Sequence, residues 1–138
     1  MVKGESQITG KRGEYRVIGK LMEKGFLVYV PVVDVEGVDC IIKNEKGRLI
    51  QLQIKTRNRT SQDVAKNFVV NRLNTNRDFF ICCHFLNSDD LWVVPSLVFA
   101  KESVINGKGQ SVLSMSRNKE YKLARYKDDL GINLLRKN

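Results

Sequence analysis

The N-terminal part of the chain alternates between apolar and charged positions with the spacing of a helix. The apolar positions recur every three or four residues and are Tyr15, Ile18, Leu21 and Met22. Charged side chains occupy the opposite side, so residues 10–24 are predicted to form an amphipathic helix that stops at Gly25. The next run, residues 26–33, is rich in valine and aromatic residues and predicts a strand with an edge or bend at Pro31.

Beyond this run, short apolar segments are separated by polar turns, which predicts strands more than helices. The expected elements are a hairpin from residues 38–43 and 48–56, a polar basic loop at 57–66, strands at 68–70, 78–86 and 91–94, a short helix at 97–104 and a terminal helix at 128–136. This order predicts a mixed α/β (α+β) fold, in which an N-terminal helix precedes a mixed β-sheet flanked by helices. It lacks the strict strand–helix alternation of a doubly wound sheet.

The turn of the hairpin determines which residues face each other across its strands. If residues 45–47 form a three-residue loop with Gly47 in the left-handed position, the numbers of facing residues sum to 92. Asp39 then falls opposite Gln53, and Lys55 lies two residues further along on the same face. A slip of one residue would separate these side chains. The pattern therefore predicts a cluster of an acid, an amide and a lysine.

The predicted N-terminal helix adds a carboxylate to this picture. Glu14 lies one turn before Ile18 and so falls on the apolar side of the helix. A carboxylate that faces a core is costly unless it is paired or binds a metal. The alternative is an ordinary first-turn glutamate that interacts with the helix N-terminus.

Composition and charge narrow the class of protein. The chain has 138 residues, 42% hydrophobic and 28% charged, and we expect one globular domain over residues 1–138. Its 24 basic and 15 acidic residues give a net charge of +9, which favours nucleic acid over a membrane as partner. Three cysteines without Cys-x-x-Cys spacing indicate buried, reduced thiols, and the one histidine, His84, is predicted to be a core residue. No signal peptide or membrane span is apparent, so we expect a cytoplasmic protein.

The predicted helix with Glu14, the strand with Asp39 in Gly-Val-Asp and the strand with Gln53-Ile54-Lys55 resemble the PD-(D/E)XK nuclease superfamily. The run Lys-Thr-Arg that begins at Lys55 is similar to the Holliday junction resolvase and intron homing endonuclease branches of that superfamily. The later segment, residues 78–96, is similar to the homing-endonuclease branch. The resemblance covers about two thirds of the chain and implies a restriction endonuclease-like core.

This resemblance implies a metal-dependent endonuclease that hydrolyses DNA phosphodiester bonds with Mg²⁺ or Mn²⁺. Glu14, Asp39, Gln53 and the Ile54 carbonyl would hold the metal, and Lys55 would orient water or stabilise charge at the phosphate. Valine replaces the proline of the family motif, and Gln53 stands where an acid is usual. A glutamine carbonyl can still bind a hard cation, but it adds no charge.

Basic residues near these positions are candidate contacts to nucleic acid. The candidates are Lys11, Arg12, Arg57, Arg59, Lys66, Arg117, Lys119, Lys122 and Arg125. Two tyrosines, Tyr121 and Tyr126, interleave the last four and could stack on bases or simply pack. Duplex or branched DNA is the expected partner, RNA is not excluded, and cleavage of both strands suggests a homodimer or higher homo-oligomer.

Three other interpretations remain open from the residues alone. The chain could be a catalytically inactive nucleic-acid-binding module on the same fold, as the neutral Gln53 would suggest. It could be a basic module that binds an acidic protein. It could also be a general α/β scaffold, in which Asp39 and Lys55 form an ordinary cross-strand ion pair of little energetic value.

Overall fold

The computed structural model describes residues 4–59 and 66–138. Its helices are α1 (Glu5–Glu23), α2 (Ser96–Glu102), α3 (Arg117–Lys122) and α4 (Asp128–Lys137), with a 3-10 turn η1 (Ala124–Tyr126). Its strands are β1 (Leu27–Tyr29), β2 (Cys40–Lys43), β3 (Leu49–Arg57), β4 (Lys66–Val70), β5 (Phe79–Phe85), β6 (Leu91–Pro95), β7 (Val104–Ile105) and β8 (Ser111–Met115). The expected mixed α/β fold with an N-terminal helix is confirmed.

Five strands form the main sheet in the order β1-β2-β3-β5-β6. All neighbours in it are antiparallel except β3 and β5, which run parallel. The parallel pair requires a crossover, and the chain makes it through a second sheet of order β4-β8-β7. β3 is the central strand of the sheet and every residue of β5 is buried, so this pair lies at the centre of the fold.

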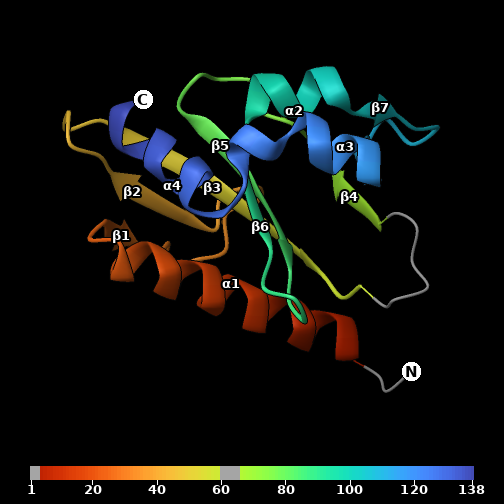
Figure 1. The fold of residues 1–138 in the computed structure, drawn as a ribbon. Helices are drawn as coiled ribbons and strands as arrows, with labels where there is room; N and C mark the ends of the chain where they lie inside the picture. Colours follow the sequence, from red (N-terminus) through yellow and green to blue (C-terminus); the bar gives the residue numbers. More distant parts are fainter. Residues whose placement is uncertain (1–3, 60–65) are drawn as a thin grey trace.

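Two apolar clusters lie on opposite faces of the main sheet. One joins α1 and α4 to the face that carries Ile50, Leu52 and Ile54. The other joins α2 and the second sheet to the face that carries Phe79 and Ile81. Figure 1 shows α1 and α2 on opposite sides of the sheet. This layering places α1 directly against β3, the strand that carries Gln53 and Lys55.

The hairpin register predicted from Gly47 is confirmed. Gly47 adopts the left-handed conformation, with φ 77°. The paired residues Cys40 and Leu52, Ile42 and Ile50 have numbers that sum to 92. The ladder stops one residue short of Asp39, however, because β2 begins at Cys40. The expected ladder pair of Asp39 with Gln53 is therefore absent.

Several element boundaries differ from the prediction for identifiable reasons. Helix α1 begins at Glu5, earlier than expected, and its buried side chains are those of Val17 and Leu21. The prediction of Tyr15 and Met22 on the buried face was wrong, since they are 70% and 61% exposed. The strand expected at residues 26–33 is shorter in the structure. It consists of β1 alone, because only the residues of β1 pair with β2.

The later segments also extend the prediction. Strands β7 and β8 and helix α3 were not predicted, whereas β4, β5, β6, α2 and α4 lie close to their expected positions. His84 and the three cysteines are buried, and the cysteines are free thiols, as predicted. The loop expected at 57–66 lies mostly outside the described residues. No helix among those described is both long enough and apolar enough to span a membrane.

Candidate active site

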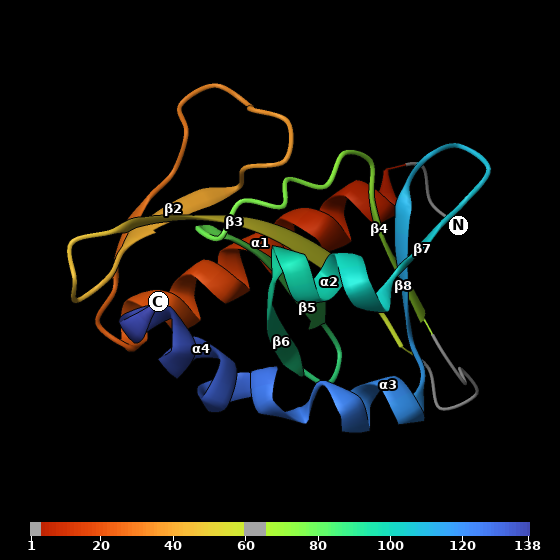
Figure 2. The same cartoon turned by 90° about the horizontal axis from the view of Figure 1, so that it is seen from above.

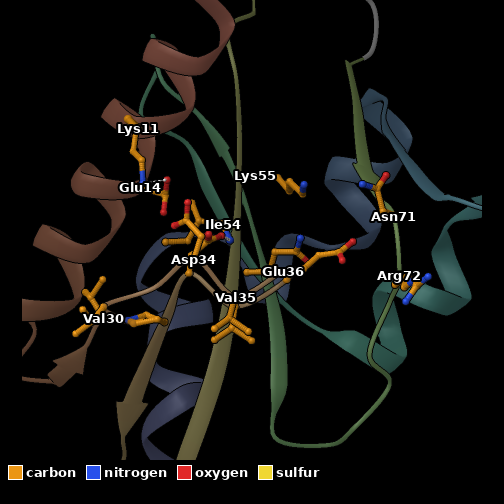
Figure 3. Close-up of a pocket in the computed structure, with 16 residues that line it drawn as sticks. Lys11, Glu14, Val30, Asp34, Val35, Glu36, Ile54, Lys55, Asn71 and Arg72 are labelled. Atoms are coloured by element: carbon orange, nitrogen blue, oxygen red, sulfur yellow. Dashed lines mark hydrogen bonds and ion pairs between the residues drawn. The ribbon is translucent and has the colours of Figure 1, made fainter.

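A cleft of about 530 Å³ opens where β3 extends past the end of β2. Its walls come from α1, from the loop between β1 and β2, and from the segment after β4 (Figure 3). Glu14, Asp39, Gln53, Ile54 and Lys55 all line it. The structure thus brings together every residue that the sequence proposed for catalysis.

Asp39 is held at the edge of β3 by its own carboxylate. The Ile54 N–H donates to Asp39 Oδ2 over 2.6 Å, and the Asp39 N–H donates to the Leu52 carbonyl over 2.9 Å. The carboxylate thus occupies the place that a continuing strand would take beside Ile54. Asp39 also lines the cleft, and a carboxylate has a second oxygen that can accept from or bind another partner.

Glu14 reaches the same place because a glycine lets α1 approach β3. A Cβ on Gly13 would lie 2.5 Å from Thr56 Cβ and Cγ2, which only glycine avoids. Burial, and then the charge of Asp39, raise the pKa of Glu14 above its ordinary value, while Lys11 acts in the opposite direction. Lys11 Nζ lies 3.4 Å from Glu14 Oε2. Two carboxylates are therefore held close together with one cation as partial compensation.

Gln53 supplies an oxygen without a partner. The side chain is 8% exposed, and its Oε1 has no hydrogen-bond partner in the described structure. An unsatisfied buried acceptor of this kind costs about 1–3 kcal/mol unless a ligand completes it. No group of three His, Cys, Asp or Glu side chains suited to a metal occurs in the described parts of the chain. The oxygen atoms that could bind a metal here instead come from two carboxylates, one side-chain amide and one backbone carbonyl.

Lys55 lies across the cleft from Glu14 (Figure 3). Beyond it, Asn71 and Arg72 form the far wall, and Asp34 lines the loop side. Asn71, Arg72, Asp34 and Glu36 were not predicted as site residues from the sequence. Asn71 and Arg72 are placed there by the crossover, since the chain must return from β4 to the start of β5 past the face that carries Lys55. Asp34 and Glu36 come from the loop between β1 and β2.

The first group of predicted basic residues divides into exposed and engaged side chains. Arg12 is exposed on α1, and Arg57 is exposed with its Nη1 donating to the Asn67 carbonyl over 3.1 Å. Arg59 pairs with Glu120 at 3.0 Å and stacks 3.9 Å over the Phe85 ring. Lys66 begins β4. Arg59 therefore contributes to packing, while Arg12 and Arg57 remain accessible.

The second basic group is not gathered with the cleft. Lys119 and Lys122 on α3 lie 3.0 and 3.1 Å from the Glu102 carboxylate. Arg117 and Arg125 are exposed, on α3 and η1. Figure 2 shows α3 on the side of the molecule opposite the β1–β2 loop, which lines the cleft. The sequence alone did not reveal this separation, because it depends on how the C-terminal segment wraps around the second apolar cluster.

A partly buried polar network connects α1 to the β5–β6 turn. His84 Nε2 lies 2.8 Å from Asp89 Oδ1, and His84 Nδ1 lies 3.4 Å from Thr56 Oγ1. Lys20 Nζ pairs with Asp89 Oδ2 at 2.9 Å. Asp89 itself adopts a left-handed φ of 62°. The network thus fixes α1, which carries Glu14, against β3 and β5.

One cleft at a sheet edge thus contains carboxylates, an amide oxygen without a partner and a lysine. Enzymes that cleave phosphodiester bonds use groups of these types. The model of the PD-(D/E)XK endonuclease family matches residues 5–106, and the chain belongs to this family. The family is one of nucleases and implies a DNA substrate. No curated protein matches the chain.

The solved structure of a bacterial homing endonuclease, I-Ssp6803I, has a similar fold. The TM-score is 0.67 at 22% identity, with 95% of this chain and 91% of that chain covered. At this identity the likeness concerns the fold, and it extends over the C-terminal segment that lies beyond the family match.

Proposed function

We propose that this protein is a divalent-metal-dependent endodeoxyribonuclease whose catalytic residues are Glu14, Asp39, Gln53 and Lys55. The observation that supports this most strongly is Gln53 Oε1, a buried oxygen without a partner that lines the same cleft as two carboxylates. A carbonyl-type oxygen beside two acids fits Mg²⁺ or Mn²⁺, which favour oxygen ligands.

Each residue has a distinct task in this proposal. Asp39 Oδ1, Glu14, Gln53 Oε1 and the Ile54 carbonyl would hold the metal. The Ile54 carbonyl points to the same strand edge as its N–H, which already donates to Asp39. When bound, the metal lowers the pKa of a water and neutralises charge on the scissile phosphate.

Lys55 and Lys11 supply the positive charge of the protein itself in this cleft. Lys55 contacts the phosphate oxygens and stabilises the charge that builds up there in the transition state. Lys11 pairs with Glu14 and opposes the rise in the pKa of Glu14 that burial and Asp39 cause.

The direct test is cleavage of end-labelled single strands, duplexes, flaps and four-way junctions in Mg²⁺ or Mn²⁺. Wild type should cut at least one substrate, and chelator should abolish cutting. Asp39→Asn keeps the acceptor for the Ile54 N–H, and Lys55→Met keeps the length of the side chain, so both should fold and fail to cut. Arg117→Ala, a change on α3 away from the cleft, is the matched control and should cut like wild type.

Two results would refute the proposal. Cutting that persists in Asp39→Asn and Lys55→Met would place catalysis elsewhere. An absence of cutting by wild type on every substrate, together with salt-dependent DNA binding and no heat of Mn²⁺ binding in calorimetry, would instead support a non-catalytic DNA-binding module. The preferred substrate would distinguish a junction-cleaving enzyme from a homing-type enzyme.

We further propose that the active form is a homodimer, because one cleft cuts one strand and a duplex needs two cuts. Sedimentation with and without duplex DNA tests this. A monomer in both conditions that nevertheless produces double-strand breaks in single turnover would contradict it.

A further inference from the structure

The β7–β8 hairpin lies beside the cleft, although it is remote from it in the sequence. Val70, the last residue of β4, pairs with Ser111, the first residue of β8. The next residue after β4, Asn71, lines the cleft, and its Oδ1 accepts a hydrogen bond from Gln110 Nε2 over 2.6 Å. The hairpin tip, residues 106–110, is therefore attached directly to the cleft wall.

The hydrogen bonds of the tip hold it in one shape. Asn106 Oδ1 accepts from the N–H groups of Lys108 and Gln110 over 2.9 and 3.0 Å. Asn106 Nδ2 donates to Gln110 Oε1 over 2.8 Å, and Gly109 takes the left-handed φ of 76° that the turn requires. A tip that is ordered before binding loses little conformational entropy when a partner arrives.

The exposed groups of this region suit base edges. The side chains of Lys108 and Arg72 are exposed and make no hydrogen bond or ion pair within the described residues. On β7, Val104 and Ile105 are 71% and 64% exposed. Arginine and lysine recognise guanine in the major groove, amides recognise adenine, and small apolar side chains contact the thymine methyl group.

We propose that the hairpin tip and Arg72 read bases in the major groove next to the cut; this rests on the proposed nuclease function. A two-stranded antiparallel ribbon fits the width of that groove. Figure 2 shows the β1–β2 loop, the segment after β4 and the hairpin tip along one side of the molecule. The cleft therefore holds the phosphate backbone while the hairpin, one strand away, enters the groove.

The experiment is selection of cut sites from a duplex library with a randomised segment, in Mg²⁺, followed by sequencing. Wild type should enrich particular bases at a few positions. Arg72→Lys keeps the charge but loses the two-pronged donor, so the preference at one position should fall about 5- to 100-fold. Lys108→Ala and Ile105→Ala should each alter other positions, whereas Lys101→Ala on α2 should leave the pattern unchanged.

Uniform cutting of all sequences by wild type would overturn the inference, as would hairpin variants with the wild-type pattern. If wild type cuts nothing, the proposed nuclease function fails separately. The same library is then sorted by DNA binding in Ca²⁺, and the bound sequences are compared. A pattern that Arg72→Lys and Lys108→Ala change would still support base reading by this hairpin, and one that they leave unchanged would overturn it.

Discussion

The close approach of α1 to β3 makes Gly13→Ala the most informative single change. The added Cβ would lie 2.5 Å from two carbons of Thr56, whereas carbon atoms settle at about 3.5 Å, so the helix must move by about 1 Å. Overpacking of this kind costs about 1–3 kcal/mol, and the higher helix propensity of alanine offsets about 1 kcal/mol of it. We expect a net loss of about 0–2 kcal/mol in the free energy of unfolding.

The effect on cleavage should be much larger than the effect on stability. Glu14 follows Gly13 directly, and a displacement of about 1 Å at a reacting group can cost about 100-fold in rate. Gly10→Ala and Gly19→Ala are matched controls in the same helix, because a Cβ at either position meets nothing within 4 Å. Both should raise the unfolding free energy by up to about 1 kcal/mol and leave the cleavage rate unchanged.

Urea unfolding and single-turnover cleavage measure the two quantities. Combining Gly13→Ala with Thr56→Gly should recover part of the lost activity, because the second change removes the three atoms nearest to the new Cβ. The reasoning is refuted if Gly13→Ala behaves like Gly10→Ala in both assays.

Three further changes test the fold and the site. Asn44→Ala removes hydrogen bonds to the N–H groups of Lys46 and Arg48 and to the Leu135 carbonyl. Urea unfolding should therefore show a loss of about 1–3 kcal/mol in the free energy of unfolding. A smaller loss would mean that water replaces these hydrogen bonds. Burial lowers the pKa of His84 below 6.5, so its contribution to stability is present above that pH and is lost as pH falls through the lowered value. Between about pH 7 and about pH 5, the unfolding free energy should therefore fall more for wild type than for His84→Gln. Equal falls for the two proteins would contradict this. Gln53→Glu adds a third carboxylate and should tighten Mn²⁺ binding in calorimetry, whereas an unchanged affinity would place Gln53 outside the metal site.

The part of the site that could be predicted is the part governed by local rules. Gly47 determines the turn, the turn determines the register, and the register brings the segment before β2 to the strand of Gln53 and Lys55. Helical periodicity placed Glu14 on the inner side of α1. The same periodicity wrongly placed Tyr15 on the buried face. Periodicity considers only apolar side chains, whereas the closest approach of α1 to β3 is made by a glycine, which has no side chain.

The remainder depends on the path of the chain through space. Asn71 and Arg72 reach the cleft only because the crossover between β3 and β5 returns over it, and no local pattern encodes that path. The β7–β8 hairpin was not predicted, although it carries a local turn signal, Asn106-Gly107 before an alternating strand. The departure of Asp39 from the ladder reflects its bond to Ile54, which replaces a backbone partner with a side chain.

The four proposed catalytic residues all lie between residues 14 and 55, within a stretch formed by α1 and the antiparallel strands β1, β2 and β3. The hairpin proposed to read bases begins much later in the chain, at Val104. A nascent chain therefore presents every proposed catalytic residue before any residue of this hairpin. Such a division lets substitutions in the hairpin change the target site while the residues that cut stay the same.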